Sequence, residues 1–158
     1  MERQFVPLAA KIGSQRHMMA IRDAFIMIMP VTIAGAVSSL LNVFLKDIPT
    51  ELEWHGFVKS VHPLIEINSK VFWGTTAIIT LAFVFALGYH LAKSYDVNPM
   101  AGGLTAFAAY LTTVPESVAE VGGTGYYYMS YTQATGLFTG ILVALIAATI
   151  FSKLALAN

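Results

Sequence analysis

The chain has 158 residues, of which 56% are hydrophobic and 11% charged, against about 25% charged residues in an average soluble domain. This composition predicts a membrane protein. The formal net charge is zero, so nothing indicates a nucleic-acid partner, and the lack of cysteine excludes disulfides, thiolate metal sites and a cysteine nucleophile.

Four long apolar stretches follow one another, at residues 24–45, 71–92, 97–114 and 134–152. About 20 helical residues cross the roughly 30 Å of bilayer hydrocarbon. The third stretch is shorter and rich in glycine and threonine, so it is either a full span or a re-entrant segment. None has a charged face, which disfavours a soluble helical bundle. The sequence therefore predicts an all-α, polytopic transmembrane protein with about four transmembrane helices.

An amphipathic helix on the cytoplasmic surface is predicted for residues 1–22. Phe5, Leu8 and Ile12 recur on one helical face, with basic residues elsewhere. A frayed N-terminal tail is the alternative.

The first apolar stretch opens behind Arg16 and Arg22 and contains Pro30 about two turns in. This proline removes one backbone hydrogen bond, so we expect a bend there. Beyond it, a small and polar stripe either packs against a neighbouring helix, which we favour, or lines a polar path. Its members are Thr32, Gly35, Ser38, Ser39 and Asn42. The Asn42 amide needs a hydrogen-bond partner, because an unsatisfied amide in hydrocarbon is costly.

A second amphipathic helix, on the outer surface, is predicted for residues 50–62. Thr50 and Glu53 have the spacing of a capping box, and Pro63 is expected to end the helix. Four residues then form one apolar face at helical spacing: Trp54, Phe57, Val58 and Val61.

If the four stretches cross the membrane in turn, six of the nine lysines and arginines lie on the same side of the membrane as the N-terminus, and three lie on the other side. The positive-inside rule therefore places both termini in the cytoplasm.

The last stretch repeats a small residue every fourth position, including Gly136-x-x-x-Gly140. Small residues let helix backbones approach closely in lipid. Packing within the chain is favoured over a dimer contact.

Catalytic groups are missing from these stretches. None contains Asp, Glu or Arg at its centre, and no protease, hydrolase or P-loop motif occurs. His90 lies near a predicted membrane boundary and is assigned no proton relay. We expect no cofactor and no metal site, and transport or a scaffold role fits better than catalysis.

Several phrases resemble one family, the enzyme IIC permease of the lactose/cellobiose (diacetylchitobiose) branch of the bacterial sugar phosphotransferase system. They are IRDAF (21–25) and MPVTIAG (29–35), the segment 68–111, and TQATGLFTGILVALIAATIFSKL (132–154). The resemblance is to the N-terminal part of such permeases. Their glutamate-proline phrase and sugar-binding histidine have no counterpart here, so we expect a fragment or truncated reading frame without transport of its own.

The resemblance implies a permease that translocates a β-linked disaccharide such as cellobiose across the bacterial inner membrane. It also implies a phospho-IIB partner that phosphorylates the sugar, and a homodimer formed through the N-terminal half. Candidate substrate-binding residues are Asn68 and Trp73, where the second span begins; a sugar ring could stack on the indole, although interfacial anchoring of Trp73 is the commoner role.

Two alternatives are kept beside this hypothesis. One is a small, complete membrane scaffold or assembly subunit with no transport of its own, and it rests on the small-residue stripe. The other is a membrane enzyme, and it rests only on His90 and the outer histidines.

Overall fold

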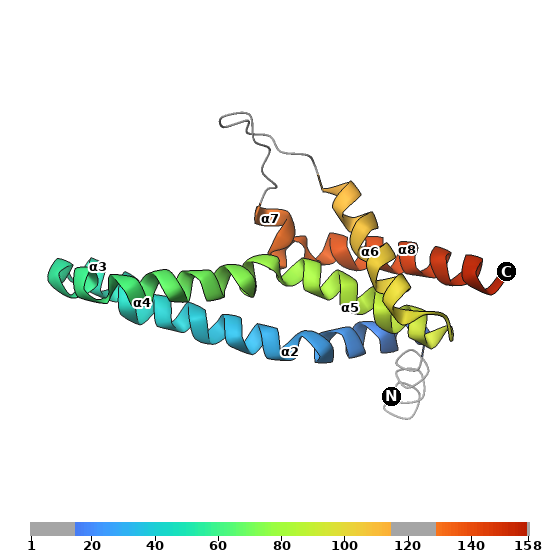
Figure 1. Ribbon diagram of the computed structural model, residues 1–158, viewed down its shortest axis with the longest axis horizontal. Helices are drawn as coiled ribbons and strands as arrows, with labels where there is room; N and C mark the ends of the chain where they lie inside the picture. Colours follow the sequence, from blue (N-terminus) through green and yellow to red (C-terminus); the bar gives the residue numbers. More distant parts are fainter. Residues whose placement is uncertain (1–14, 115–128, 158) are drawn as a thin grey trace, which may run out of the picture.

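Every regular element in the computed structural model, which describes residues 15–114 and 129–157, is helical (Figure 1). Helix α2 (Arg16–Asn42) continues through a π-helical turn, η1 (Val43–Asp47), into α3 (Ile48–Glu51). After a tight reversal come α4 (His55–Gly74), the 3-10 turn η2 (Thr76–Ile78) and α5 (Ile79–Ser94). The remaining elements are α6 (Pro99–Thr113), α7 (Met129–Thr132), η3 (Ala134–Gly136) and α8 (Leu137–Ala157).

The predicted all-α membrane fold is confirmed. Three helical stretches are long and apolar enough to cross a membrane: Arg16–Glu51, His55–Ser94 and Ala134–Ala157. The third predicted span corresponds to α6, which has only 15 residues. At about 1.5 Å per residue α6 is about 22 Å long, short of the roughly 30 Å of hydrocarbon.

Only part of the surface helix predicted for residues 1–22 can be compared with the structure. Residues 1–14 of the predicted surface helix lie outside the described residues. Residues 16–22 are not part of a separate helix but form the first turns of α2. The helix also continues through Pro30, so the proline does not end it.

The prediction of an outer helix over residues 50–62 was wrong in its boundaries. Thr50 donates its hydroxyl to the carbonyl of Lys46, one turn back, and Glu53 has a left-handed φ of 56°. The pair therefore sits in the reversal between α3 and α4, and is not a capping box. Pro63 lies inside α4. It is exposed there, and the helix continues past it with one backbone hydrogen bond fewer.

The second predicted span, 71–92, is not one continuous helix. It combines the end of α4, the turn η2 and most of α5. The break falls at Thr75, whose backbone leaves the helical region at φ −124° and ψ −80°. Its hydroxyl donates to the carbonyl of Val71 at 2.7 Å, which satisfies an acceptor at the end of α4.

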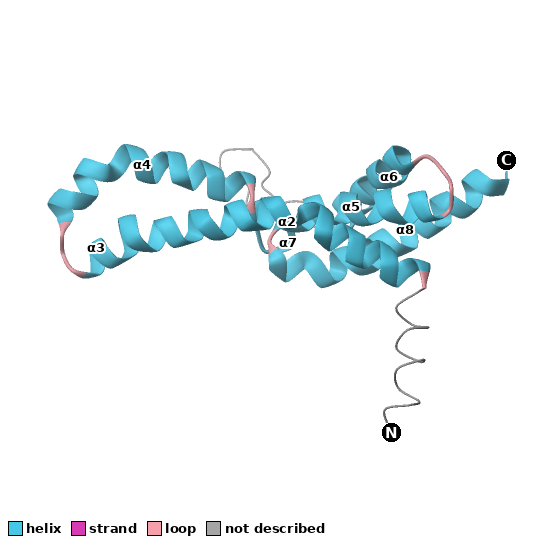
Figure 2. Ribbon diagram, turned by 90° about the horizontal axis from the view of Figure 1, so that it is seen from below, coloured by secondary structure: helices cyan, strands magenta, loops and turns pink. Residues whose placement is uncertain are grey.

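Helix α5 lies at the centre of the packing, with α2, α6 and α8 around it (Figures 1 and 2). Its approach to α6 depends on glycines. A Cβ on Gly88 would lie 2.7 Å from the carbonyl oxygen of Gly102, and one on Gly103 would lie 2.8 Å from the Phe85 ring. The fully buried core includes Phe83, Val84, Leu87, Leu91, Ala106, Tyr110, Ala144 and Ala148.

The small-residue stripe of the last span packs within the chain, as favoured from the sequence. Its buried members face α5 and α6: Gly136, Gly140, Ala144, Ala148 and Ser152. A Cβ on Gly140 would lie 2.8 Å from Cγ2 of Val84 and 3.0 Å from Cγ2 of Thr80. The repeat therefore sets the distance between α8 and α5.

We predict that Gly140→Leu destabilises the protein by about 1–3 kcal/mol, because the added side chain has no space against α5. The measurement is the apparent Tm of the purified chain in detergent. Gly56→Ala is the matched control, since a Cβ at Gly56 meets nothing within 4 Å. Equal Tm values for the two variants would contradict the packing assigned to Gly140.

Candidate functional site

The candidate residue Asn68 is buried between α2 and α4, with 8% of its surface exposed. Its amide nitrogen donates to the carbonyl of Ser38 and to Oδ1 of Asn42, both at 2.8 Å. The Ser38 hydroxyl returns a hydrogen bond of 3.0 Å to the carbonyl of Asn68. Asn68 is therefore a polar clamp between two helices, and it supplies the partner that the sequence required for Asn42.

From Gly35 to Asn42 the stripe on α2 packs against its neighbour, whereas Thr32 is exposed and its hydroxyl donates to the carbonyl of Ile28 on the same helix. Two turns before Asn42, a Cβ on Gly35 would lie 3.1 Å from the Thr75 hydroxyl. The opposite face of α2 and η1 is exposed and apolar: Ile26, Ile33, Val37, Leu40 and, in η1, Phe44. The favoured interpretation, helix packing, is thus confirmed.

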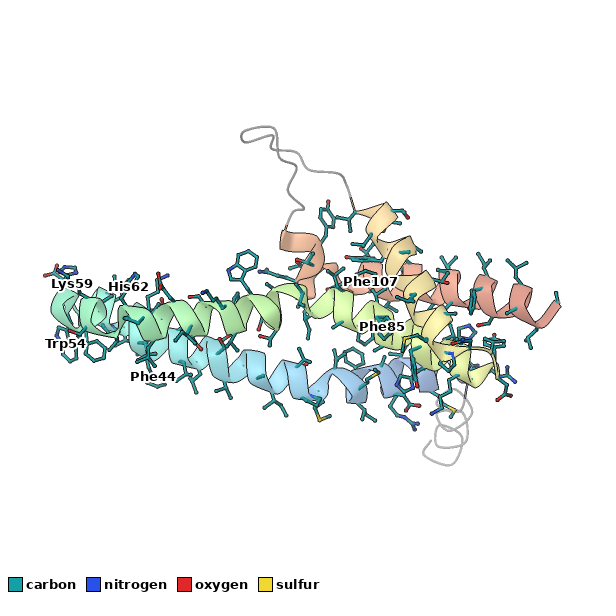
Figure 3. The ribbon with its side chains drawn as sticks, viewed as in Figure 1. Phe44, Trp54, Lys59, His62, Phe85 and Phe107 are labelled. Carbon is teal, nitrogen blue, oxygen red and sulfur yellow. The ribbon has the colours of Figure 1, made fainter. Side chains whose placement is uncertain are left out.

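The second candidate, Trp73, occupies a different face of α4. Its side chain is 57% exposed and borders a groove of about 530 Å³. Beside Trp73, Val58 and Ile65, five polar side chains line this groove, four from α4 and one from η1: Lys46, His62, Glu66, Ser69 and Lys70. Figure 3 shows His62 and Lys59 along one edge of the α2–α4 hairpin and Trp54 and Phe44 along the other. The structure therefore does not bring Asn68 and Trp73 into one site.

The groove has mixed charge. His62 and Glu66 approach within 3.8 Å, one helical turn apart, with both side chains mostly exposed. Lys46 and Lys70 form no ion pair within the described part of the chain. The groove thus offers donors and an acceptor beside one aromatic face, which suits a polyhydroxylated ligand.

Sequence reasoning missed this groove because it treated residues 46–70 as a loop carrying a short helix. The i, i+3, i+4 spacing of residues 62, 66, 69, 70 and 73 places them on one helical face. The sequence contains this spacing, but a helix expected to end at Pro63 separates residue 62 from residues 66–73.

Over residues 15–114 and 129–157 there is no group of three or more His, Cys, Asp or Glu side chains placed to hold a metal ion. His90 lies against Tyr89, with the two rings 5.4 Å apart and edge-on.

Comparison with known proteins identifies the family. The model for "Phosphotransferase system, EIIC" matches residues 22–157, most of the chain. The chain belongs to the phosphotransferase system EIIC family. The match is to the N-terminal part of EIIC proteins, as the ordered phrases in the sequence predicted.

Curated EIIC relatives match essentially the whole chain. The cellobiose-specific EIIC component of Lactococcus lactis is 29% identical and covers 100% of the chain, which spans 41% of that protein. The oligo-beta-mannoside-specific EIIC component of Bacillus subtilis is 28% identical over 97% of the chain and 34% of its own length. The chain thus spans about two fifths or less of the relatives it matches.

A solved EIIC structure has the same fold. It is the transporter ChbC, the IIC component of an N,N'-diacetylchitobiose-specific phosphotransferase system, with a TM-score of 0.76 and 25% identity. The alignment covers 97% of this EIIC chain and 37% of ChbC.

We predict that Asn68→Ala destabilises this EIIC chain by about 1–2 kcal/mol, since the bonds to Ser38 and Asn42 are lost within an apolar hairpin. Asn42→Ala should cost less in the Asn68→Ala background than alone, by about 0.6 kcal/mol. Unfolding in mixed micelles with increasing denaturing detergent gives both values. Ser60→Ala is the control, because that exposed hydroxyl bonds only its own helix, at Gly56.

Proposed function

We propose that this chain works in the membrane permease component of a phosphoenolpyruvate-dependent sugar phosphotransferase system, taking up a β-linked disaccharide such as cellobiose. Two kinds of similarity support this: the family match over residues 22–157 and the cellobiose and oligo-β-mannoside specificities in the names of its relatives. The observation that carries the proposal is the agreement of both fold and sequence with EIIC proteins over nearly the whole chain.

In this proposal a phospho-IIB protein transfers its phosphoryl group to a hydroxyl of the sugar on the cytoplasmic side. The chain contains no cysteine, so a phosphocysteine carrier would belong to the IIB partner. The N-terminus is cytoplasmic, supported by the distribution of lysine and arginine. A homodimer through this part of the protein is supported by the large exposed apolar face of α2.

Trp73 is proposed to contact the sugar from the groove on α4. The indole offers an apolar face for a sugar ring, while Glu66, Ser69 and Lys70 lie within one to two turns on the same helix. Asn68 would act on this site only indirectly, by holding α4 against α2.

The uptake test uses the chain together with the remaining part of the Lactococcus lactis cellobiose-specific EIIC, in cells that contain IIA and IIB but no other cellobiose permease. We expect radiolabelled cellobiose to accumulate at least tenfold above cells with either part alone. The α-linked disaccharide maltose, the matched control, should not accumulate.

A chain that inserts, co-purifies with the added part and still gives no uptake would contradict the proposal. If such a chain also self-associates in detergent, the scaffold subunit without transport is favoured.

The groove is tested with the two tryptophans of the chain. In the Trp54→Phe variant, Trp73 is the only tryptophan, and we expect its emission to change saturably with cellobiose. In the Trp73→Phe variant, Trp54 should not respond, and Trp73→Ala should weaken binding about two- to tenfold through loss of the aromatic face. Equal responses from both tryptophans, or none from Trp73, would remove the groove from the sugar pathway.

A further inference from the structure

An apolar crevice runs between α2, α5 and α6. Its volume is about 510 Å³, and all ten side chains that line it are apolar. They include Val31 on α2, Leu81 and Phe85 on α5, and Phe107 on α6. Figure 3 labels Phe85 and Phe107, which lie on the neighbouring helices α5 and α6.

A second, smaller groove with charged side chains lies next to the crevice. Met27 borders both, and the second groove, of about 390 Å³, is lined by Asp23, Tyr89, His90 and Lys93 as well. The two grooves are therefore neighbours along α2 and α5; together they are called the channel here, with an apolar part and a polar end that carries Asp23, His90 and Lys93.

The polar end favours an anion. The charge of Asp23 is already countered by Arg22, whose Nη2 lies 2.8 Å from Oδ1. Lys93 is exposed and forms no ion pair within the described ranges. The His90 ring adds an N–H donor in the same groove.

The length of the channel matches one leaflet of a bilayer. From Lys93 to Leu81 there are 12 residues of continuous helix, or about 18 Å along α5. Half of the hydrocarbon core is about 15 Å thick. A molecule with its anionic group at Lys93 would reach the bilayer centre with an apolar chain at Leu81.

We propose that this channel binds one phospholipid, with its phosphate at Lys93 and His90 and one acyl chain between Phe85, Phe107 and Val31. The lining carries no polar side chain along the apolar part, which excludes a sugar there. A helix of a second copy would have to place an acidic group opposite Lys93, whereas a phospholipid supplies the anion and the flexible chain together. The proposal does not depend on which sugar, if any, the protein carries.

The test uses brominated lipids, which quench tryptophan on contact, in a Trp54→Phe/Trp73→Phe background. Phe85→Trp places a reporter in the channel. Phe138→Trp is the matched control, because Phe138 is 73% exposed on α8 and does not line the channel. Both proteins are held in detergent with a few molecules of acyl-brominated phosphatidylglycerol per chain.

We expect quenching of the Phe85→Trp reporter at lipid ratios that leave the Phe138→Trp reporter unquenched. Lys93→Gln should raise the lipid concentration needed at least fivefold, while Lys153→Gln, at an exposed lysine of α8, should not. Equal quenching of both reporters, or no effect of Lys93→Gln, would overturn the proposal. The proposal would also be overturned if the fluorescence of the Phe85→Trp reporter changed only when a dimer dissociates in detergent, and not when lipid is added. A second copy of the chain would then occupy the channel.

Discussion

The close backbone approach of α5 to its neighbours is the constraint on which the rest of the structure depends. Gly88 lets the backbone of α6 approach α5 closely, and Gly140 does the same between α8 and α5. In lipid the hydrophobic effect does not drive helices together, so such contacts contribute through dispersion and close fit. A methyl group at either glycine would separate the helices and disturb the core around Phe83 and Leu87.

Hydrogen bonds between polar groups also hold the helices together. The α2–α4 hairpin contains few large buried side chains, and Asn68 compensates by bonding Ser38 and Asn42. Within the bundle, the Tyr110 hydroxyl donates to the carbonyl of Tyr131, and Thr80 donates to that of Gln133. These bonds hold the segment before α8 against α5 and α6, where its backbone carbonyls would otherwise lack partners.

The sequence allowed the fold class and the two packing stripes to be predicted, because both depend on local composition and helical spacing. The stripes on α2 and α8 consist of residues too small or too polar to face lipid, which left packing as their favoured role. The sequence predicts that Asn42 has a hydrogen-bond partner, but it does not identify Asn68 as that partner. The pairing depends on how α4 aligns with α2, and this alignment is set by the reversal at Glu53.

The candidate site was harder to predict for a similar reason. Asn68 and Trp73 were grouped because they are close in sequence, yet five residues on a helix turn the side chain by about 140°. One therefore enters the hairpin interface and the other the groove. The boundary expected at Pro63 is also instructive, because a proline on an exposed face of α4 costs one hydrogen bond without ending the helix.

The offset between the hairpin and α8 has a consequence for how the membrane meets the protein. Helix α8 begins beside Thr80, whereas Gly35 lies against Thr75, farther along the hairpin. Beyond Gly35 the uncharged run continues through the end of α2 and into η1 for about ten residues, or about 15 Å. Helix α8 alone, with 21 residues, is already about as long as the hydrocarbon is thick. A flat bilayer positioned on α8 would leave Val37, Leu40 and Phe44 in water, and one positioned on α2 would expose the other end of α8. The hydrophobic surface is therefore stepped, and a uniform layer of lipid cannot cover it: either the bilayer changes thickness around the protein or another protein surface covers the step.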